Sequence, residues 1–257
     1  MILKDPSLVK KRDAMAAAGA IVAEALNLVA RTVAPGVRTG ELDAMVEELI
    51  RSRGALPSFK GYNGYPASVC TSVNDEIVHG IPGPRRLVSG DILSVDVGAF
   101  LGGYHGDAAL TIPVGDIDEL SARLIRVTRA SLEAALTRCR AGNHIGDVGS
   151  VVQTMALEAG FQVVRDFTGH GIGRRLHERP QIPNYGRPGA GPVIRSGDAL
   201  AVEPMINAGT MAIKILEDNW TAVTYDGSRS AHFEHTVFVG ERGAEILTPW
   251  DWRWDDL

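Results

Sequence analysis

The sequence repeats a pattern of glycines at a nearly constant spacing, and this internal similarity constrains the fold more than any other feature. Three glycines are each followed by another glycine 106 residues later, which pairs Gly36 with Gly142, Gly40 with Gly146 and Gly54 with Gly160. The tripeptide Ser-Gly-Asp at 89–91 recurs at 196–198, a difference of 107. Self-similarity over a long period is typical of a duplicated structural unit. The alternative is a chance match, because 29 of the 257 residues are glycine.

Acidic residues follow the same register. Two pairs obey it, Glu41 with Asp147 and Asp96 with Glu203. Further on, Val-Gly-Asp at 114–116 is echoed by Val-Gly-Glu at 239–241, and the increase of the difference to 125 implies an insertion of about 18 residues. We therefore predict two related halves, about 1–118 and 119–245, followed by a tail rich in tryptophan.

Four stretches are typical of helices, and four short β-branched runs are typical of strands. The predicted helices cover residues 8–34, 40–53, 119–140 and 146–159. The predicted strands cover residues 91–97, 108–114, 199–203 and 233–239. Helices paired with hairpins favour an α+β fold, in which helices pack on the outer face of a curved antiparallel sheet. Because no low-complexity linker separates the halves, we expect a single domain over residues 1–257.

Charge and cysteine content argue against several classes of protein. The net charge is −5 and no long basic run occurs, so the basic surface of a general nucleic-acid binder is not expected. Cys70 and Cys139 form no CxxC pair, which argues against a disulfide framework or a structural zinc site and fits a reducing cytoplasm. The alanine-rich stretch at 14–30 contains Glu24 and shows helical spacing, so we expect an amphipathic helix and no membrane association.

Two aspartates of the first half are predicted to lie close together. Asp96 stands inside the apolar segment 93–98, where an unpaired charge would be costly to bury. After a glycine-rich turn, Asp107 begins another apolar run, so a hairpin would bring both carboxylates together. Two close carboxylates need a shared proton or a cation. The alternative is that each aspartate caps a turn.

The second half repeats this arrangement. Glu203 ends one apolar run and Glu234 precedes another. In a true repeat Asp96 and Glu203 would come from equivalent strands, and Asp107 and Glu234 would both open the return strand. Four carboxylates would then meet at one pseudo-symmetry axis. His170, among the glycines of 169–173, would join them, although a lone histidine is more often structural. One imidazole with several carboxylates suits two divalent ions, with manganese, iron, cobalt or zinc favoured over calcium. Because two adjacent metal ions are a known hydrolytic arrangement, the cluster predicts a hydrolase.

Five residues, in this order and at about these spacings, resemble the metal ligands of the methionine aminopeptidases: Asp96, Asp107, His170, Glu203 and Glu234. The surrounding strings are similar to the family's signatures and read SVNDEIVHGIP at 72–82, SVDVG at 94–98, GHGIG at 169–173 and FEHT at 233–236. The resemblance extends over nearly the whole chain. It implies the pseudo-twofold symmetric fold called pita-bread, which agrees with the internal repeat.

The resemblance implies a role for each ligand. Asp107 and Glu234 would bridge two metal ions, and Asp96 would chelate one of them. His170 and Glu203 would complete the other. Glu203 is also the best candidate to shuttle the proton of the attacking water.

Two further histidines match residues of the family that contact the scissile amide. His79 and His177 would stabilise charge that develops on the carbonyl oxygen. From the sequence alone, His79 fits a turn and His177 fits a surface helix or loop equally well.

The resemblance also implies an apolar pocket for the methionine side chain, formed by Tyr62, Tyr65, Cys70 and Trp220 with Phe59 near its rim. Aromatic groups and a thiol suit a flexible thioether. The alternative is that these side chains simply pack the core. The pocket departs from the family pattern at Asn63, where short bacterial members often carry histidine, and at Leu176, where an aromatic residue is common.

The short type I bacterial form fits best, because neither a zinc-binding extension nor the long insertion of the second class is present. The implied activity is that of a methionyl aminopeptidase, which removes the initiator methionine of nascent polypeptides when the second residue is small. We expect a cytoplasmic monomer, with the ribosome surface as a further candidate partner. The tryptophans of the tail, Trp250, Trp252 and Trp254, are expected to pack against the body.

Two other functions compete with this interpretation. Prolidases and aminopeptidase P share the five ligands, but they normally carry a large additional domain at the amino terminus. A catalytically silent binding protein of the same fold is the other alternative. The intact ligand set argues against it.

Overall fold

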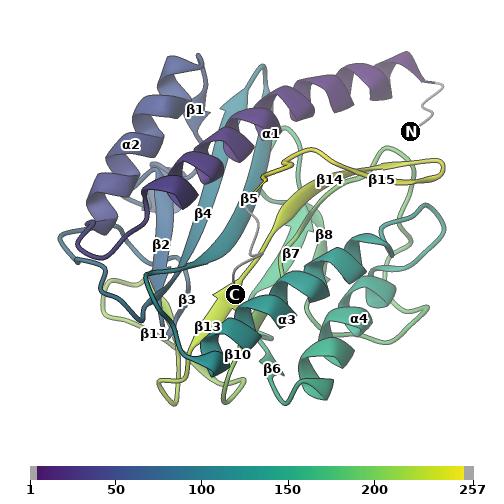
Figure 1. Ribbon diagram of the computed structural model, residues 1–257. Helices are drawn as coiled ribbons and strands as arrows, with labels where there is room; N and C mark the ends of the chain where they lie inside the picture. Colours follow the sequence, from purple (N-terminus) through teal and green to yellow (C-terminus); the bar gives the residue numbers. More distant parts are fainter. Residues whose placement is uncertain (1–4, 252–257) are drawn as a thin grey trace.

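Two pairs of helices cover two antiparallel sheets (Figure 1). The first pair is α1 (Pro6–Thr32) and α2 (Thr39–Ser52), and the second pair is α3 (Glu119–Leu136) and α4 (Ile145–Glu158). The computed structural model describes residues 5–251. All four predicted helices are confirmed, with ends that differ by a few residues from the prediction.

Helix α1 begins and packs as its sequence dictates. The side chain of Asp5 accepts a hydrogen bond from the Ser7 amide, and Pro6 occupies the first turn, where its missing N–H costs nothing. By length and composition alone α1 could cross a membrane, but 56% of its apolar window is buried inside the protein. Its buried side, which includes Met15, Val22 and Leu26, packs against the first sheet. This burial is that of a core helix.

The strands form two larger and two smaller sheets. The first large sheet contains β1 (Leu56–Pro57), β4 (Ile92–Leu101), β2 (Val69–Val73) and β5 (Tyr104–Pro113), with β5 paired to β4. The second has the order β15 (Gly243–Ile246), β14 (His235–Gly240), β9 (Ala199–Val202), β7 (Thr168–Gly171) and β8 (Glu178–Pro183). The small sheets are β13 (Ser230–His232), β10 (Met205–Asn207) and β6 (Gln162–Val163), and β11 (Ile213–Ile215), β12 (Ala222–Thr224) and β3 (Glu76–Val78).

Within residues 5–251 the strand pairings are all antiparallel. The predicted α+β class is therefore confirmed. The curved sheet that we expected is built from two main sheets rather than one continuous ladder.

The internal repeat of the sequence corresponds to matching backbone hydrogen bonds in two loops, one after α1 and one after α3. The Gly36 amide donates to the Leu87 carbonyl at 2.7 Å, and the Gly142 amide donates to the Ile194 carbonyl at 2.9 Å. Both glycines have left-handed backbones, with φ of 96° and 94°, which residues with a side chain rarely adopt. The repeated glycines of the sequence are thus explained by a loop conformation that occurs once in each half.

The second helix of each pair begins with the same cap. The Glu41 carboxylate accepts a hydrogen bond from the Arg38 amide, and the Asp147 carboxylate accepts one from the His144 amide. These are the two acidic residues that matched at a spacing of 106. The predicted pseudo-twofold symmetry is confirmed, whereas the division of the chain at residue 118 stays a prediction.

The two halves meet at a seam between β5 and the consecutive strands β13 and β14. The Thr236 hydroxyl accepts from the Asp107 amide at 3.0 Å and donates to the Asp107 carbonyl at 2.7 Å. The Thr111 hydroxyl makes the same two bonds, both of 2.9 Å, to the amide and carbonyl of His232. Thr236 lies 125 residues after Thr111, and His232 lies 125 residues after Asp107. The hydrogen bonds between the halves therefore follow the pseudo-symmetry.

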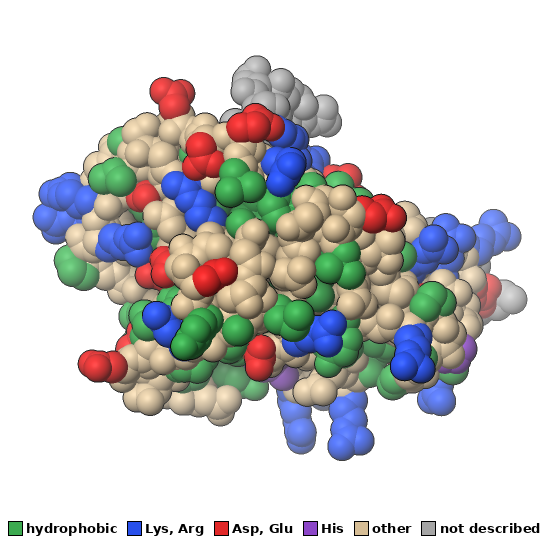
Figure 2. Space-filling view, turned by 90° about the horizontal axis from the view of Figure 1, so that it is seen from below, with side chains coloured by type: hydrophobic (Ala, Val, Ile, Leu, Met, Phe, Trp, Pro, Cys, Tyr) green, Lys and Arg blue, Asp and Glu red, His purple; other side chains and the backbone are tan. Residues whose placement is uncertain are grey.

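One cluster of buried apolar residues receives side chains from both halves, including Leu26, Leu93, Leu132 and Leu200. At the end of the chain, the Trp250 ring stacks on His235 with centroids 4.6 Å apart, so this tryptophan packs as expected. Trp252 and Trp254 lie outside the described residues. On the face shown in Figure 2, acidic and basic side chains are interspersed.

Helix α1 crosses β5 at two glycines. A methyl group added at Gly106 would lie 2.8 Å from the Gly19 nitrogen, which is backbone and cannot rotate away. We predict that Gly106→Ala lowers the free energy of unfolding by about 1–3 kcal/mol, measured by urea denaturation of the metal-free protein. Gly83→Ala is the matched control, because nothing lies within 4 Å of its added carbon, and it should change stability by no more than about 0.5 kcal/mol. Equal effects of the two substitutions would contradict the packing at this crossing.

Candidate metal centre

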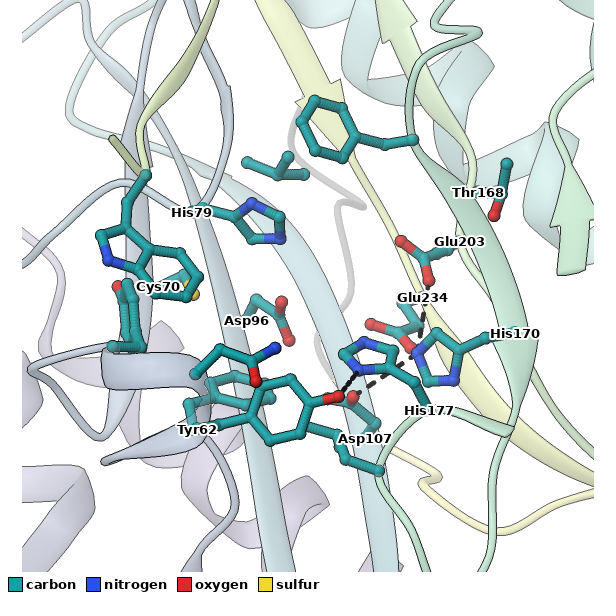
Figure 3. Close-up of a pocket in the computed structure, with 17 residues that line it drawn as sticks. Tyr62, Cys70, His79, Asp96, Asp107, Thr168, His170, His177, Glu203 and Glu234 are labelled. Carbon is teal, nitrogen blue, oxygen red and sulfur yellow. Dashed lines mark hydrogen bonds and ion pairs between the residues drawn. The ribbon is translucent and has the colours of Figure 1, made fainter. Parts of the chain in front are cut away.

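Side chains from both halves line one cavity of about 260 Å³ (Figure 3). The five residues predicted to be ligands all contribute to its lining: Asp96 on β4, Asp107 on β5, His170 on β7, Glu203 directly after β9 and Glu234 between β13 and β14. The carboxylates and the imidazole reach the cavity from five segments. A cluster spread over the sequence thus becomes one site.

The β4–β5 hairpin places its two aspartates on the same face. Asp96 is opposite Ala109 and Asp107 is opposite Gly98. Residues offset by two positions on paired strands are diagonal neighbours, within reach of one another. The hairpin therefore brings the two carboxylates together as the sequence predicted, and the turn-capping alternative is wrong for both.

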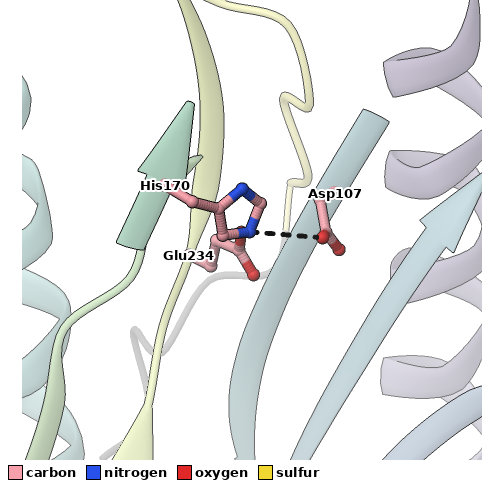
Figure 4. Close-up of side chains that lie close together, drawn as sticks. All are labelled: Asp107, His170 and Glu234. Carbon is pink, nitrogen blue, oxygen red and sulfur yellow. Dashed lines mark ion pairs between the residues drawn. The ribbon is translucent and has the colours of Figure 1, made fainter. Parts of the chain in front are cut away.

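The tightest group joins Asp107, His170 and Glu234 (Figure 4). One potential ligand atom from each lies within 4.8 Å of the other two. The His170 Nε2 atom is 4.0 Å from Asp107 Oδ2 and 3.6 Å from Glu203 Oε1. Three or more such atoms around one point are the arrangement that a divalent cation requires.

Several of these polar atoms have no partner. Asp96 Oδ1, Asp107 Oδ1 and Glu234 Oε1 are buried without a hydrogen bond among the residues that the structure describes. Buried polar atoms are nearly always hydrogen-bonded, so three unsatisfied carboxylate oxygens at one place are suited to bind a cation. A divalent cation fits this donor set.

The histidine is oriented as a metal ligand. His170 Nδ1 lies 2.9 Å from the Gly171 carbonyl, to which it can only donate. This bond leaves the lone pair of Nε2 directed at the carboxylates. A backbone acceptor on the far nitrogen is the usual support for a metal-bound imidazole.

Burial sets the protonation of the site. It raises the pKa of Asp96 to about 7. Burial, followed by the neighbouring carboxylates, also raises the pKa values of Asp107, Glu203 and Glu234 well above their ordinary range. Burial lowers the pKa of His170 to about 3, so its imidazole is neutral at physiological pH. The acids therefore hold protons unless a cation replaces them.

The two other predicted histidines also line the cavity. His79 has a left-handed backbone, with φ of 62°, and its ring packs edge-on against Phe167 with centroids 5.2 Å apart. Burial lowers the pKa of His79 to about 4, so it too is neutral. His177 lies against His170, with ring centroids 4.2 Å apart. Both imidazoles stand beside the predicted ligands, where they could contact a bound substrate.

The predicted pocket residues line the same cavity: Phe59, Tyr62, Tyr65, Cys70 and Trp220. All five belong to a small apolar cluster or pack against it, so core packing and pocket lining are not alternatives here. The Tyr65 and Trp220 rings meet edge to face at 5.0 Å. Asn63 and Leu176 reach the cavity as well, and Leu176 is buried within the apolar cluster.

Sequence reasoning missed His232. Its buried Nε2 atom lies 3.8 Å from Glu203 Oε2 and has no hydrogen-bond partner within residues 5–251. The alternation of His232 with Glu234 along an extended segment was a usable signal, because residues two apart share a face. Phe167 and Thr168, which line the cavity, precede His170 in the sequence without a comparable signal.

One relation inferred from the repeat is wrong. Asp107 and Glu234 are not equivalent positions, because the hydrogen bonds of the seam pair Asp107 with His232 at the spacing of 125. Glu234 corresponds to Ala109, and its amide donates to the Ala109 carbonyl at 2.9 Å. The two carboxylates face each other because they are offset by two residues on adjoining segments.

Comparisons with known proteins agree with this site. A profile described as "Metallopeptidase family M24" matches residues 13–241. Methionine aminopeptidase 1 of Bacillus subtilis (strain 168) is 50% identical over 234 residues, which are 91% of this chain and 94% of that protein. A crystal structure of methionine aminopeptidase from Thermotoga maritima matches with a TM-score of 0.92 at 48% identity, covering 96% of this chain and 99% of that one. The prolidase from Pyrococcus furiosus shares the fold, with a TM-score of 0.77 at 22% identity, and covers 95% of this chain and 65% of the prolidase.

The raised carboxyl pKa values predict a pH-dependent stabilisation by metal. Between about pH 4 and pH 7 the folded metal-free protein keeps a proton on Asp96 that the unfolded chain, with a pKa of 3.8, has lost. This group therefore costs stability as pH rises through that window, and a cation that takes the place of the proton removes the cost. His170 adds no competing proton, because its pKa is about 3.

We predict that Mn²⁺ raises the melting temperature more at pH 7.5 than at pH 5.5, each relative to chelated protein at the same pH. Asp107→Asn is the control, because it keeps the size of the side chain and removes a predicted ligand. The Asp107→Asn substitution should abolish most of the rise in melting temperature caused by Mn²⁺ at both pH values. An equal increment in the native protein at both pH values would show that no carboxyl proton is displaced.

Proposed function

Because the chain belongs to metallopeptidase family M24 and, within it, to the methionine aminopeptidases, we propose that it removes the initiator methionine of nascent polypeptides. We propose that it uses two divalent metal ions for this reaction. It is a metal-dependent aminopeptidase. The observation that carries the proposal is the set of unpartnered buried carboxylate oxygens beside His170. Such a set is stable only with protons or cations.

The donor set supports a dinuclear site. In our proposal Asp107 and Glu234 would serve as ligands of both ions, Asp96 would serve as a ligand of one ion, and His170 and Glu203 would serve as ligands of the other. Manganese, iron and cobalt suit these ligands best, and zinc is compatible. When bound, the ions would polarise the scissile carbonyl and lower the pKa of the attacking water.

The protein's own groups complete the reaction. Glu203 takes the proton of the attacking water and passes it to the leaving amine, a role supported by its place in the cavity lining beside His170. His79 and His177 are neutral imidazoles that donate hydrogen bonds to the scissile amide and to charge on its carbonyl oxygen. The methionine side chain lies among Tyr65, Cys70 and Trp220, where aromatic and thiol groups contact the thioether.

We also propose a preference for a small second residue. A cavity of about 260 Å³ must hold the methionine side chain and the scissile peptide, which leaves little room for a bulky neighbour. The two cysteines are free and buried, which supports a reducing cytoplasm. We propose a monomer that meets its substrates at the ribosome surface, without specific nucleic-acid or membrane binding.

Peptide cleavage tests the proposed function. Met-Ala-Ser should release free methionine, chelator should stop the release, and added manganese or cobalt should restore it. Met-Lys-Ser should be cleaved at least about tenfold more slowly, because its second side chain is bulky and charged. Failure to release methionine from either peptide by metal-loaded protein would favour the binding-protein alternative.

The role of His79 is tested separately from that of the ligands. We predict that His79→Ala lowers kcat by about 10²–10³-fold, the usual effect of losing a hydrogen-bond donor to the developing charge. Its metal content should match that of the native enzyme, whereas Asp107→Ala should lose metal. Because alanine is strained at φ of 62°, thermal unfolding is measured alongside to show that the variant is folded. Loss of metal from folded His79→Ala would make this histidine a ligand instead.

A further inference from the structure

Tyr62 contacts more than the substrate pocket. Its hydroxyl lies 2.7 Å from Nδ1 of His177, across 115 residues of sequence (Figure 3). The two ring centroids are 5.1 Å apart with planes tilted by 53°, so the contact is made through the hydroxyl and not by stacking. A pocket wall needs only the ring. The hydroxyl serves a different purpose.

The Tyr62 hydroxyl can donate to Nδ1 of His177 or accept from it, so this bond couples the hydroxyl to the tautomer of the imidazole. A neutral imidazole has one donor and one acceptor nitrogen, and the partner of one nitrogen determines the state of the other. When the Tyr62 hydroxyl donates to Nδ1, the hydrogen of the ring resides on Nε2. A donor at Nε2 is the state that a carbonyl oxygen with growing negative charge requires.

The geometry around His177 leaves little freedom for its ring. The Tyr62 hydroxyl holds one edge, and the His170 ring meets it at 68° with centroids 4.2 Å apart. His177 itself is exposed, so without these contacts its side chain would be free to rotate into solvent. We propose that Tyr62 is a positioning residue that fixes the ring of His177 and its Nε2–H tautomer. This inference rests on the proposed function.

The chain fixes Tyr62 by a short turn, η1 (Tyr62–Gly64). The Tyr62 amide donates to the Phe59 carbonyl at 2.9 Å, and its carbonyl accepts from the Tyr65 amide at 2.9 Å. Gly61 and Asn63, on either side, both have left-handed backbones with φ of 86° and 48°. A non-glycine residue in this conformation is strained, so the turn is held by its surroundings.

The neighbouring Tyr65 provides a matched comparison. Its hydroxyl donates to backbone carbonyls, 3.0 Å from that of Val69 and 2.9 Å from that of Gly80. It contacts neither His79 nor His177 through this group. The two tyrosines therefore share a pocket but differ in what their hydroxyls hold.

Removal of each hydroxyl tests the inference. Tyr62→Phe should lower kcat for Met-Ala-Ser by about tenfold or more with a small change in KM, as expected when an active-site histidine loses its orienting partner. In a His177→Ala background the same substitution should have no further effect, because its target is gone. Tyr65→Phe should lower activity by the same factor in both backgrounds. A Tyr62→Phe variant that raises KM without lowering kcat, or that is additive with His177→Ala, would make Tyr62 a pocket residue only.

A spectroscopic measurement separates this inference from the proposed function. Nitrogen NMR of histidine-labelled protein, assigned with His177→Ala, should show the Nε2–H tautomer of His177 in the native chain. Tyr62→Phe should give a mixture of tautomers. This result can be obtained whether or not the protein cleaves Met-Ala-Ser, so a failure of the proposed activity would not hide it. An unchanged tautomer in Tyr62→Phe would overturn the inference.

Discussion

The structure depends on the burial of carboxylates that do not have partners of their own. Asp96, Asp107 and Glu234 each direct an oxygen into the protein without a hydrogen bond among the described residues, and burial raises the pKa of each acid. Such a cluster is costly unless protons or cations neutralise it. The first half supplies two of the predicted ligands and the second half supplies three, so the full donor set forms only where the halves meet. It also links the fold to the proposed chemistry, because the residues that would hold a cation line the cavity that the proposed substrate would enter.

The seam between β5 and the strands β13 and β14 holds the backbone of these side chains in place. The Thr236 hydroxyl bonds to the amide and carbonyl of Asp107, and the Thr111 hydroxyl bonds to the same two groups of His232. These matching hydrogen bonds follow the internal repeat of the sequence. Function departs from symmetry at this point. One half places Asp107 where the other places His232, and Glu234 stands where its counterpart is Ala109. The two halves thus share one backbone arrangement, and the side chains that differ between them would provide distinct positions for metal and substrate.

Some of this could be predicted from sequence and some could not. The helices followed from periodicity and breaks, and Asp96 stood out because a charge inside an apolar strand demands compensation. The glycine spacing predicted the repeated loops, because Gly36 and Gly142 both require the same left-handed backbone conformation. The prediction that Asp107 and Glu234 are equivalent was wrong because it matched the starts of two apolar runs. The hydrogen bonds between the halves instead follow a spacing of 125, which makes His232, two residues before Glu234, the counterpart of Asp107. The bond from Tyr62 to His177 joins a strained turn to a distant loop, and no local pattern encodes such a contact.

Anomalous diffraction from crystals of the manganese-loaded protein tests the central claim most directly. We predict two anomalous peaks about 3.5–4 Å apart, with oxygens of Asp107 and Glu234 near both and His170 Nε2 near one. Asp96 and Glu203 should each approach one peak. The absence of any peak beside Asp107 and His170 in a crystal of active enzyme, or a peak elsewhere with these carboxylates still unpartnered, would contradict the account.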